Sequence, residues 1–81
     1  MIKELIPGKL YAPNILLVAY YDKIQKQFAL ITKKDIFMYI GIEPYQNHFK
    51  ICIHFHIIFK DKFLYVEKPT LEIFLSQIKL L

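Results

Sequence analysis

The sequence contains no arginine: all 11 basic residues of the 81-residue chain are lysines, and the formal net charge is +4. Lysine attracts phosphate as a point charge, but it lacks the planar fork that reads guanine or clamps a phosphate with two parallel hydrogen bonds. This composition excludes arginine-based sequence readout and leaves only loose contact with nucleic acid.

Long apolar runs are also missing. A membrane-spanning helix needs about 20 consecutive apolar residues, whereas the longest clean run here is residues 15–21, and His54 and His56 interrupt residues 51–59. Residues 1–8 lack the apolar core and the small-residue cleavage site of a secretory signal. We therefore predict no membrane partner and a cytoplasmic location.

Groups that do chemistry are scarce. Cys52 is the single cysteine, which excludes an internal disulfide and fits a reducing compartment. Ser76 is the single serine, and the two glycines, Gly8 and Gly41, cannot form a glycine-rich phosphate loop. The carboxylates are scattered, and no oxyanion hole is signalled for Cys52 beside His54. We predict no enzyme, no catalytic residue and no organic cofactor.

What the chain has in abundance is apolar surface. Hydrophobic residues make up 56% of it, and the mean hydropathy is +0.31. Residues 1–81 have room for one domain, and a domain this small buries only a modest share of its surface. The excess predicts a protein partner or a homo-oligomer. The alternative is a monomer whose terminal segments cover the outward apolar side chains.

Short β-branched and aromatic stretches separated by turns predict strands. The expected strands are residues 9–12, 15–21, 28–32, 36–40, 48–59 and 63–66. Residues 15–21 are apolar on both faces and predict a buried strand. The expected turns are Pro7-Gly8, Lys33-Lys34-Asp35, the end of a strand at Gly41, a loop at residues 43–47, and a three-residue hairpin connection at residues 60–62. That connection places Leu64 and Val66 opposite Ile58 and His56, away from the face of Phe59.

After Pro69 the apolar period changes to that of a helix, with Leu71, Phe74, Leu75 and Ile78 on one side and Thr70 as the N-cap. A short helical segment is therefore expected, and a last edge strand is the alternative. Many short strands with tight turns predict a small barrel, which also hides strand edges.

The segments PGKLY at residues 7–11, FALITKKDIFMYIG at residues 28–41 and HFHIIFKDKFLYV at residues 54–66 resemble small SH3-like (KOW-like) barrel proteins of tailed phages. The resemblance implies the fold class: mostly β, a small SH3-like barrel of about five strands with a short C-terminal helical segment. It also implies a viral origin, for which the expected location is the host cytoplasm or the virion, and it implies no activity.

Polar side chains gather on one face of the expected strand 48–59. Cys52, His54 and His56 alternate along it with His48 and Lys50, whereas the odd-numbered residues 49–59 are all apolar and predict the core face. Neighbours on one strand face lie about 7 Å apart, so Cys52, His54 and His56 form a candidate zinc or copper site. The alternatives are a half-exposed sheet face and a histidine stripe at a pH-sensitive subunit contact.

Lysines in turns provide a second candidate site, for single-stranded nucleic acid bound with tyrosine stacking. The residues concerned are Lys23, Lys26, Lys33, Lys34, Lys60 and Lys62. Acidic neighbours such as Asp35 and Asp61 weaken the positive field there, so solvated turn lysines are the simpler interpretation. From the sequence we therefore expect a non-enzymatic binding or structural module acting through protein contact or self-association. Nucleic-acid binding and a metal-binding strand face are the alternatives.

Overall fold

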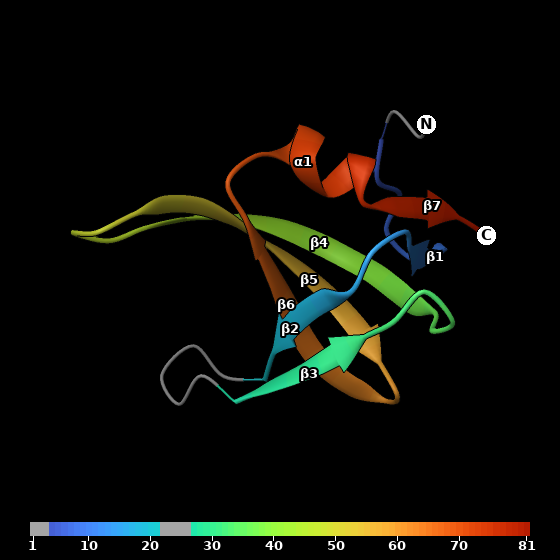
Figure 1. The fold of residues 1–81 in the computed structure, drawn as a ribbon. Coiled ribbons are helices and arrows are strands. Elements are labelled where there is room, and N and C mark those ends of the chain that lie inside the picture. Colours follow the sequence, from blue (N-terminus) through green and yellow to red (C-terminus); the bar gives the residue numbers. More distant parts are fainter. Residues whose placement is uncertain (1–3, 22–26) are drawn as a thin grey trace.

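The computed structural model describes residues 4–21 and 27–81, which form one curled, antiparallel sheet with a short helix (Figure 1). Along the sheet the strand order is β3-β2-β6-β5-β4-β1-β7. The elements are β1 (Leu10–Pro13), β2 (Leu17–Tyr20), β3 (Phe28–Ile31), β4 (Phe37–Gln46), β5 (Ile51–Phe59), β6 (Lys62–Lys68), α1 (Leu71–Ser76) and β7 (Ile78–Leu80). The predicted mostly-β class is confirmed, but the described residues contain seven strands rather than about five.

Aromatic side chains dominate the core inside the curl of the sheet. The Phe55 ring of β5 stacks on the Phe74 ring of α1, with centroids 4.2 Å apart, and Phe37 of β4 lies against the same Phe74 ring at 6.4 Å. Helix α1 therefore closes the core over the inner face of the sheet. Thr70 caps this helix as predicted, because its Oγ1 accepts a hydrogen bond from the Ile73 N–H at 3.2 Å.

The two alternatives for the C-terminus both occur, one after the other. Helix α1 ends at Ser76, and the chain continues directly as β7, which pairs with β1 at the end of the sheet. The competing strand was thus correct for residues 78–80 and the helix for residues 71–76. A buried Ile78 joins the two elements to the core.

The connection between β5 and β6 has two residues rather than the predicted three. Lys60 and Asp61 both have positive φ, 51° and 63°, as a type I′ turn requires, and Phe59 pairs with Lys62. A register shift of one residue moves every side chain to the other face of a strand. Leu64 and Val66 therefore lie opposite Ile57 and Phe55, in the core, and the predicted outward placement was wrong.

The predicted core face of residues 49–59 is only half correct. Phe55, Ile57 and Phe59 are buried, but Phe49 is 93% exposed and Ile51 is 74% exposed. The reason is that the first part of β5 protrudes from the rest of the fold (Figure 1). The second part lies over the core, where Phe74 of α1 packs on Phe55. The strand expected at residues 15–21 is likewise shorter, and Val18 of β2 faces outward.

Strand β4 does not end at Gly41 as expected. An irregularity between Tyr39 and Gly41 shifts its register against β5, and the strand then continues through the predicted loop to Gln46. This second half of β4 and the first half of β5 form a hairpin that protrudes from the body, drawn in yellow-green to olive in Figure 1. We call residues 42–53 the arm. Within the described residues, no helix is long and apolar enough to cross a membrane.

Candidate functional site

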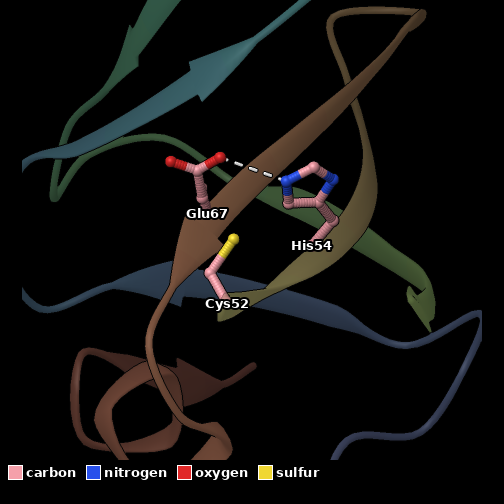
Figure 2. Close-up of side chains that lie close together, drawn as sticks. All are labelled: Cys52, His54 and Glu67. Carbon is pink, nitrogen blue, oxygen red and sulfur yellow. Dashed lines mark hydrogen bonds and ion pairs between the residues drawn. The ribbon is translucent and has the colours of Figure 1, made fainter. Parts of the chain in front are cut away.

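Three side chains that can ligate a metal meet on the outer face of the sheet (Figure 2). Cys52 and His54 are two residues apart on β5, so their side chains leave the same face of the strand. Glu67 of β6 pairs directly with His54 across the two strands. Their ligand atoms all lie within 4.8 Å of one another. We call Cys52, His54 and Glu67 the polar cluster.

His54 is the most deeply buried polar residue of the described chain, at 1% exposure. Its imidazole lies between two tyrosine rings: Tyr45 of β4 stacks on one side at 4.6 Å, and Tyr65 of β6 lies on the other at 4.4 Å. Both tyrosines are diagonal neighbours of His54 across the paired strands, a distance that aromatic side chains bridge. The stack fixes the plane of the imidazole and directs its edge toward Glu67.

Glu67 is held at both carboxylate oxygens. Oε1 lies 3.1 Å from Nε2 of His54, and because a carboxylate only accepts, that nitrogen donates; Oε2 accepts from the Lys50 ammonium. Burial acts to raise the pKa of Glu67, but the hydrogen bonds from Lys50 and His54 together outweigh it, and the pKa falls below its usual 4.5. The hydrogen bond to Glu67 correspondingly raises the pKa of Lys50. The carboxylate is therefore ionised at neutral pH.

The structure brings two of the three predicted metal ligands together and separates the third. Cys52 and His54 belong to the polar cluster, whereas His56 contacts Glu43 of β4, with Nε2 3.2 Å from Oε1. His48, expected on the same strand face, lies in the loop before β5. Glu67 was not foreseen, because the three-residue connection assumed for residues 60–62 shifts β6 by one position and turns Glu67 to the opposite face.

The tip of the arm is a tight turn built on Asn47. Its Oδ1 accepts hydrogen bonds from the backbone N–H groups of Phe49 and Lys50 at 2.8 and 2.9 Å, and its own N–H donates to the Lys50 carbonyl at 3.0 Å. Such Asx turns satisfy the backbone locally. The turn leaves the Phe49 ring in solvent at the end of the arm, although a phenylalanine gains most from burial.

The two sides of the arm differ in polarity. Cross-strand pairs share a face, so Gln46 with Ile51 and Pro44 with Ile53 form one side together with Ile42, and none of these residues is charged. We call this the apolar side of the arm. The opposite side carries Glu43, Tyr45 and Cys52, and Cys52 belongs to the polar cluster. The arm is thus an amphipathic ribbon whose apolar side extends the core face of β5 into solvent.

Of the lysines predicted for nucleic-acid contact, Lys33 and Lys34 lie together on the surface. Lys33 and Lys34 line a surface depression with Leu16 and Thr32, and the field of Lys60 reaches Asp35 of the same corner. Lys62 lies over the Tyr21 ring at 5.6 Å from its centroid. Two of the predicted residues, Lys23 and Lys26, lie outside the described residues.

The remaining candidate for chemistry, Ser76, donates its hydroxyl to the Ile73 carbonyl at 2.7 Å within α1. It is exposed and lies in a helix that covers the opposite, inner side of the sheet from the polar cluster. Comparison with known proteins adds no assignment: no family model, curated protein or solved structure matches the chain.

Proposed function

We propose that the protein is a non-enzymatic binding module that associates with a second copy of itself through the apolar side and tip of the arm. The observation that carries this proposal is the exposure of Phe49 and Ile51, at 93% and 74%, on a hairpin that the hydrogen bonds of Asn47 close at its tip. Burying one such side chain contributes about 1.5–3 kcal/mol. Large apolar side chains held together in solvent are typical of interaction surfaces.

The chemistry of the arm favours a second copy as the occupant. A chain of net charge +4 repels its copies, so a self-contact is best made where there is no charge, and the apolar side of the arm has none. A two-fold axis places identical patches against each other. Pro44 has no N–H to offer along the open edge of β4, which disfavours edge-to-edge pairing and leaves packing of the apolar sides as the contact.

Sedimentation equilibrium over a concentration series tests this proposal. Stable interfaces bury about 1,200–2,000 Å² in total, and one arm offers few residues, so we expect a reversible monomer–dimer equilibrium. Raising the salt concentration should strengthen it, because salt screens the repulsion between the positive chains. A single monomeric species at millimolar protein in high salt would overturn the proposal.

The matched variants are Phe49→Ser with Ile51→Ser on the arm and Phe63→Ser on β6. Phe63 is 73% exposed and lies beside the β5–β6 turn, at the opposite end of β5 from the arm. We expect the arm variant to be monomeric and the Phe63 variant to associate like the wild type. Equal loss of association in both variants would show that the contact is not made by the arm.

A second candidate function is weak binding of single-stranded nucleic acid. The observation that favours it is that Lys33 and Lys34 line one surface depression, while the positive charge of Lys60 in the β5–β6 turn acts on Asp35 of the same corner. Nucleic-acid binding should weaken as the salt concentration rises, because it releases counterions, whereas the proposed self-association should strengthen. A fluorescence titration with a labelled oligonucleotide at low salt tests it, and Lys33→Gln with Lys34→Gln should weaken binding.

We further propose that the protein is an SH3-like barrel related to proteins of tailed phages. The curled antiparallel sheet is compatible with an SH3-like barrel, and the motifs at residues 7–11, 28–41 and 54–66 support kinship with the barrel proteins of tailed phages. A solved structure of one of those phage proteins with the strand order β3-β2-β6-β5-β4-β1-β7 would support this kinship, and a different order would contradict it.

A further inference from the structure

We propose that Cys52, His54 and Glu67 bind one Zn²⁺ ion, with the fourth position of the metal open to water. This inference does not depend on self-association through the apolar side of the arm. It rests on the three side chains drawn in Figure 2, which point toward one common space from two adjacent strands. Two of them are almost completely buried, with Cys52 at 6% and His54 at 1% exposure.

The distances are close to those of a zinc site. With Zn–S of about 2.3 Å and Zn–N and Zn–O of about 2.0–2.1 Å in a tetrahedron, neighbouring ligand atoms lie about 3.3–3.6 Å apart. The His54 and Glu67 atoms are 3.1 Å apart, and no ligand atom of the cluster is more than 4.8 Å from another. The longest of these separations would have to shorten by about 1 Å to reach the tetrahedral values.

The donor set selects the metal. A thiolate and an imidazole favour zinc over magnesium or calcium, which prefer oxygen ligands throughout. Charge favours a divalent cation as well, because the Cys52 thiolate and the Glu67 carboxylate are both negative and the Lys50 ammonium offsets only one of these charges.

The surroundings hold the ligands in place. The tyrosine rings on both faces of His54 fix its imidazole plane, and Lys50 binds Oε2 of Glu67. Contacts of this kind orient ligands and typically change metal affinity by about 10- to 100-fold when they are removed. Oε1 faces Nε2 of His54, and a bound metal would replace the hydrogen bond between these two atoms. His56 is unsuited as the third ligand because its Nε2 contacts Glu43 instead.

Metal titration of the untagged, metal-free protein tests the proposal, with Zn²⁺ alone as the ligand and a coloured chelator as the competitor. We expect one Zn²⁺ per chain. Glu67→Gln should weaken binding by more than the roughly 10- to 100-fold cost of a supporting contact, because a ligand itself is lost. His56→Gln is the matched control and should bind like the wild type. Sub-stoichiometric binding, or equal affinity in Glu67→Gln, would overturn the proposal.

Co²⁺ added to the wild-type protein provides a second readout that needs no variant. Coordination by the Cys52 thiolate should produce a sulfur-to-metal charge-transfer band in the near ultraviolet, which Zn²⁺ should abolish by displacement. Absence of that band would exclude Cys52 as a ligand and overturn the proposed set. The Phe49→Ser with Ile51→Ser variant should bind Zn²⁺ normally, so that failure of one proposal leaves the other to be judged separately.

Discussion

At the scale of single residues, His54 shows how the sheet can bury a polar side chain. Burying an imidazole without partners costs several kcal/mol in an apolar medium. Here the ring faces are covered by Tyr45 and Tyr65, and its Nε2 donates to Glu67, which in turn is bound by Lys50. The charged end of this chain of contacts lies at the surface, so the buried ring is connected to solvent through ionised groups.

A simpler carboxylate illustrates the same physics in a corner that is open to solvent. Asp35 accepts hydrogen bonds at Oδ2 from the backbone N–H and the hydroxyl of Thr32, at 2.8 and 3.0 Å. The backbone bond is the larger cause and the hydroxyl the smaller cause of a pKa below the usual 3.8 for Asp35. Because the folded pKa is depressed, the stabilisation is complete above pH 3.8 and is lost as the pH falls through the folded pKa.

We therefore predict that Asp35 titrates below 3.8 in the folded protein, measured by carboxyl ¹³C NMR. Thr32→Val should keep most of the depression, because the backbone N–H remains when the hydroxyl is removed. An ordinary pKa for Asp35 in the wild type would contradict the hydrogen bonds described here.

The sequence predicted correctly which site residues share a face of one strand. It did not predict which residue of the neighbouring strand lies beside them. The alternation along residues 48–59 placed Cys52 and His54 on one face, as the structure confirms. Glu67 was missed because its position depends on the β5–β6 register. That register follows from positive φ angles at Lys60 and Asp61, which neither residue type signals strongly.

At the scale of elements, the β5–β6 turn is held in a conformation that its residues do not favour. Lys60 at φ 51° occupies the left-handed region, which costs a non-glycine residue about 1–2 kcal/mol. Asn-Gly is the preferred pair for this turn type. We predict that Lys60→Asn with Asp61→Gly raises the free energy of unfolding by about 1 kcal/mol, measured by urea denaturation.

Gly8 also has a positive φ angle, but there the residue type suits the conformation, and the same denaturation measurement can test it. It occupies φ 88° in the turn after Pro7, where the Lys9 N–H donates to the Ile6 carbonyl at 3.1 Å. Gly8→Ala should therefore lower stability, although nothing lies within 4 Å of the added methyl group. If the turn variant of residues 60 and 61 were no more stable than the wild type, left-handed strain at Lys60 would not be the limiting feature.

The elements were predicted correctly where a single residue type determines the local structure. They were predicted incorrectly where burial depends on contacts with the rest of the fold. The Thr70 cap and the Pro7-Gly8 turn follow from single residue types, and both are present. The burial of residues 49–59 depends on which part of β5 lies over the core. The apolar pattern is the same in both halves, so no local signal marks Phe49 and Ile51 as exposed.

At the scale of the whole molecule, the C-terminal segment joins the two ends of the chain to the core. The Phe74 ring of α1 covers Phe55 and Phe37, and β7 is the partner of β1, which otherwise pairs only with the start of β4 among the described strands. The Asn14 N–H also donates to the Gln77 carbonyl at 2.7 Å. Helix α1 and strand β7 thus cover the core and the edge of β1, and the stability of the fold should depend on them.

Phe74→Ala tests this dependence. A phenylalanine with no exposed surface typically costs about 3–5 kcal/mol when it is truncated, against a total of about 5–15 kcal/mol for a small domain. We therefore expect a large fall in the thermal midpoint, measured by circular dichroism. Ile73→Ala changes the adjacent, largely outward-facing residue and should cost about 1 kcal/mol or less. Similar losses in both variants would mean that α1 contributes through helix formation alone, and that the contact of Phe74 with Phe55 and Phe37 does not close the core.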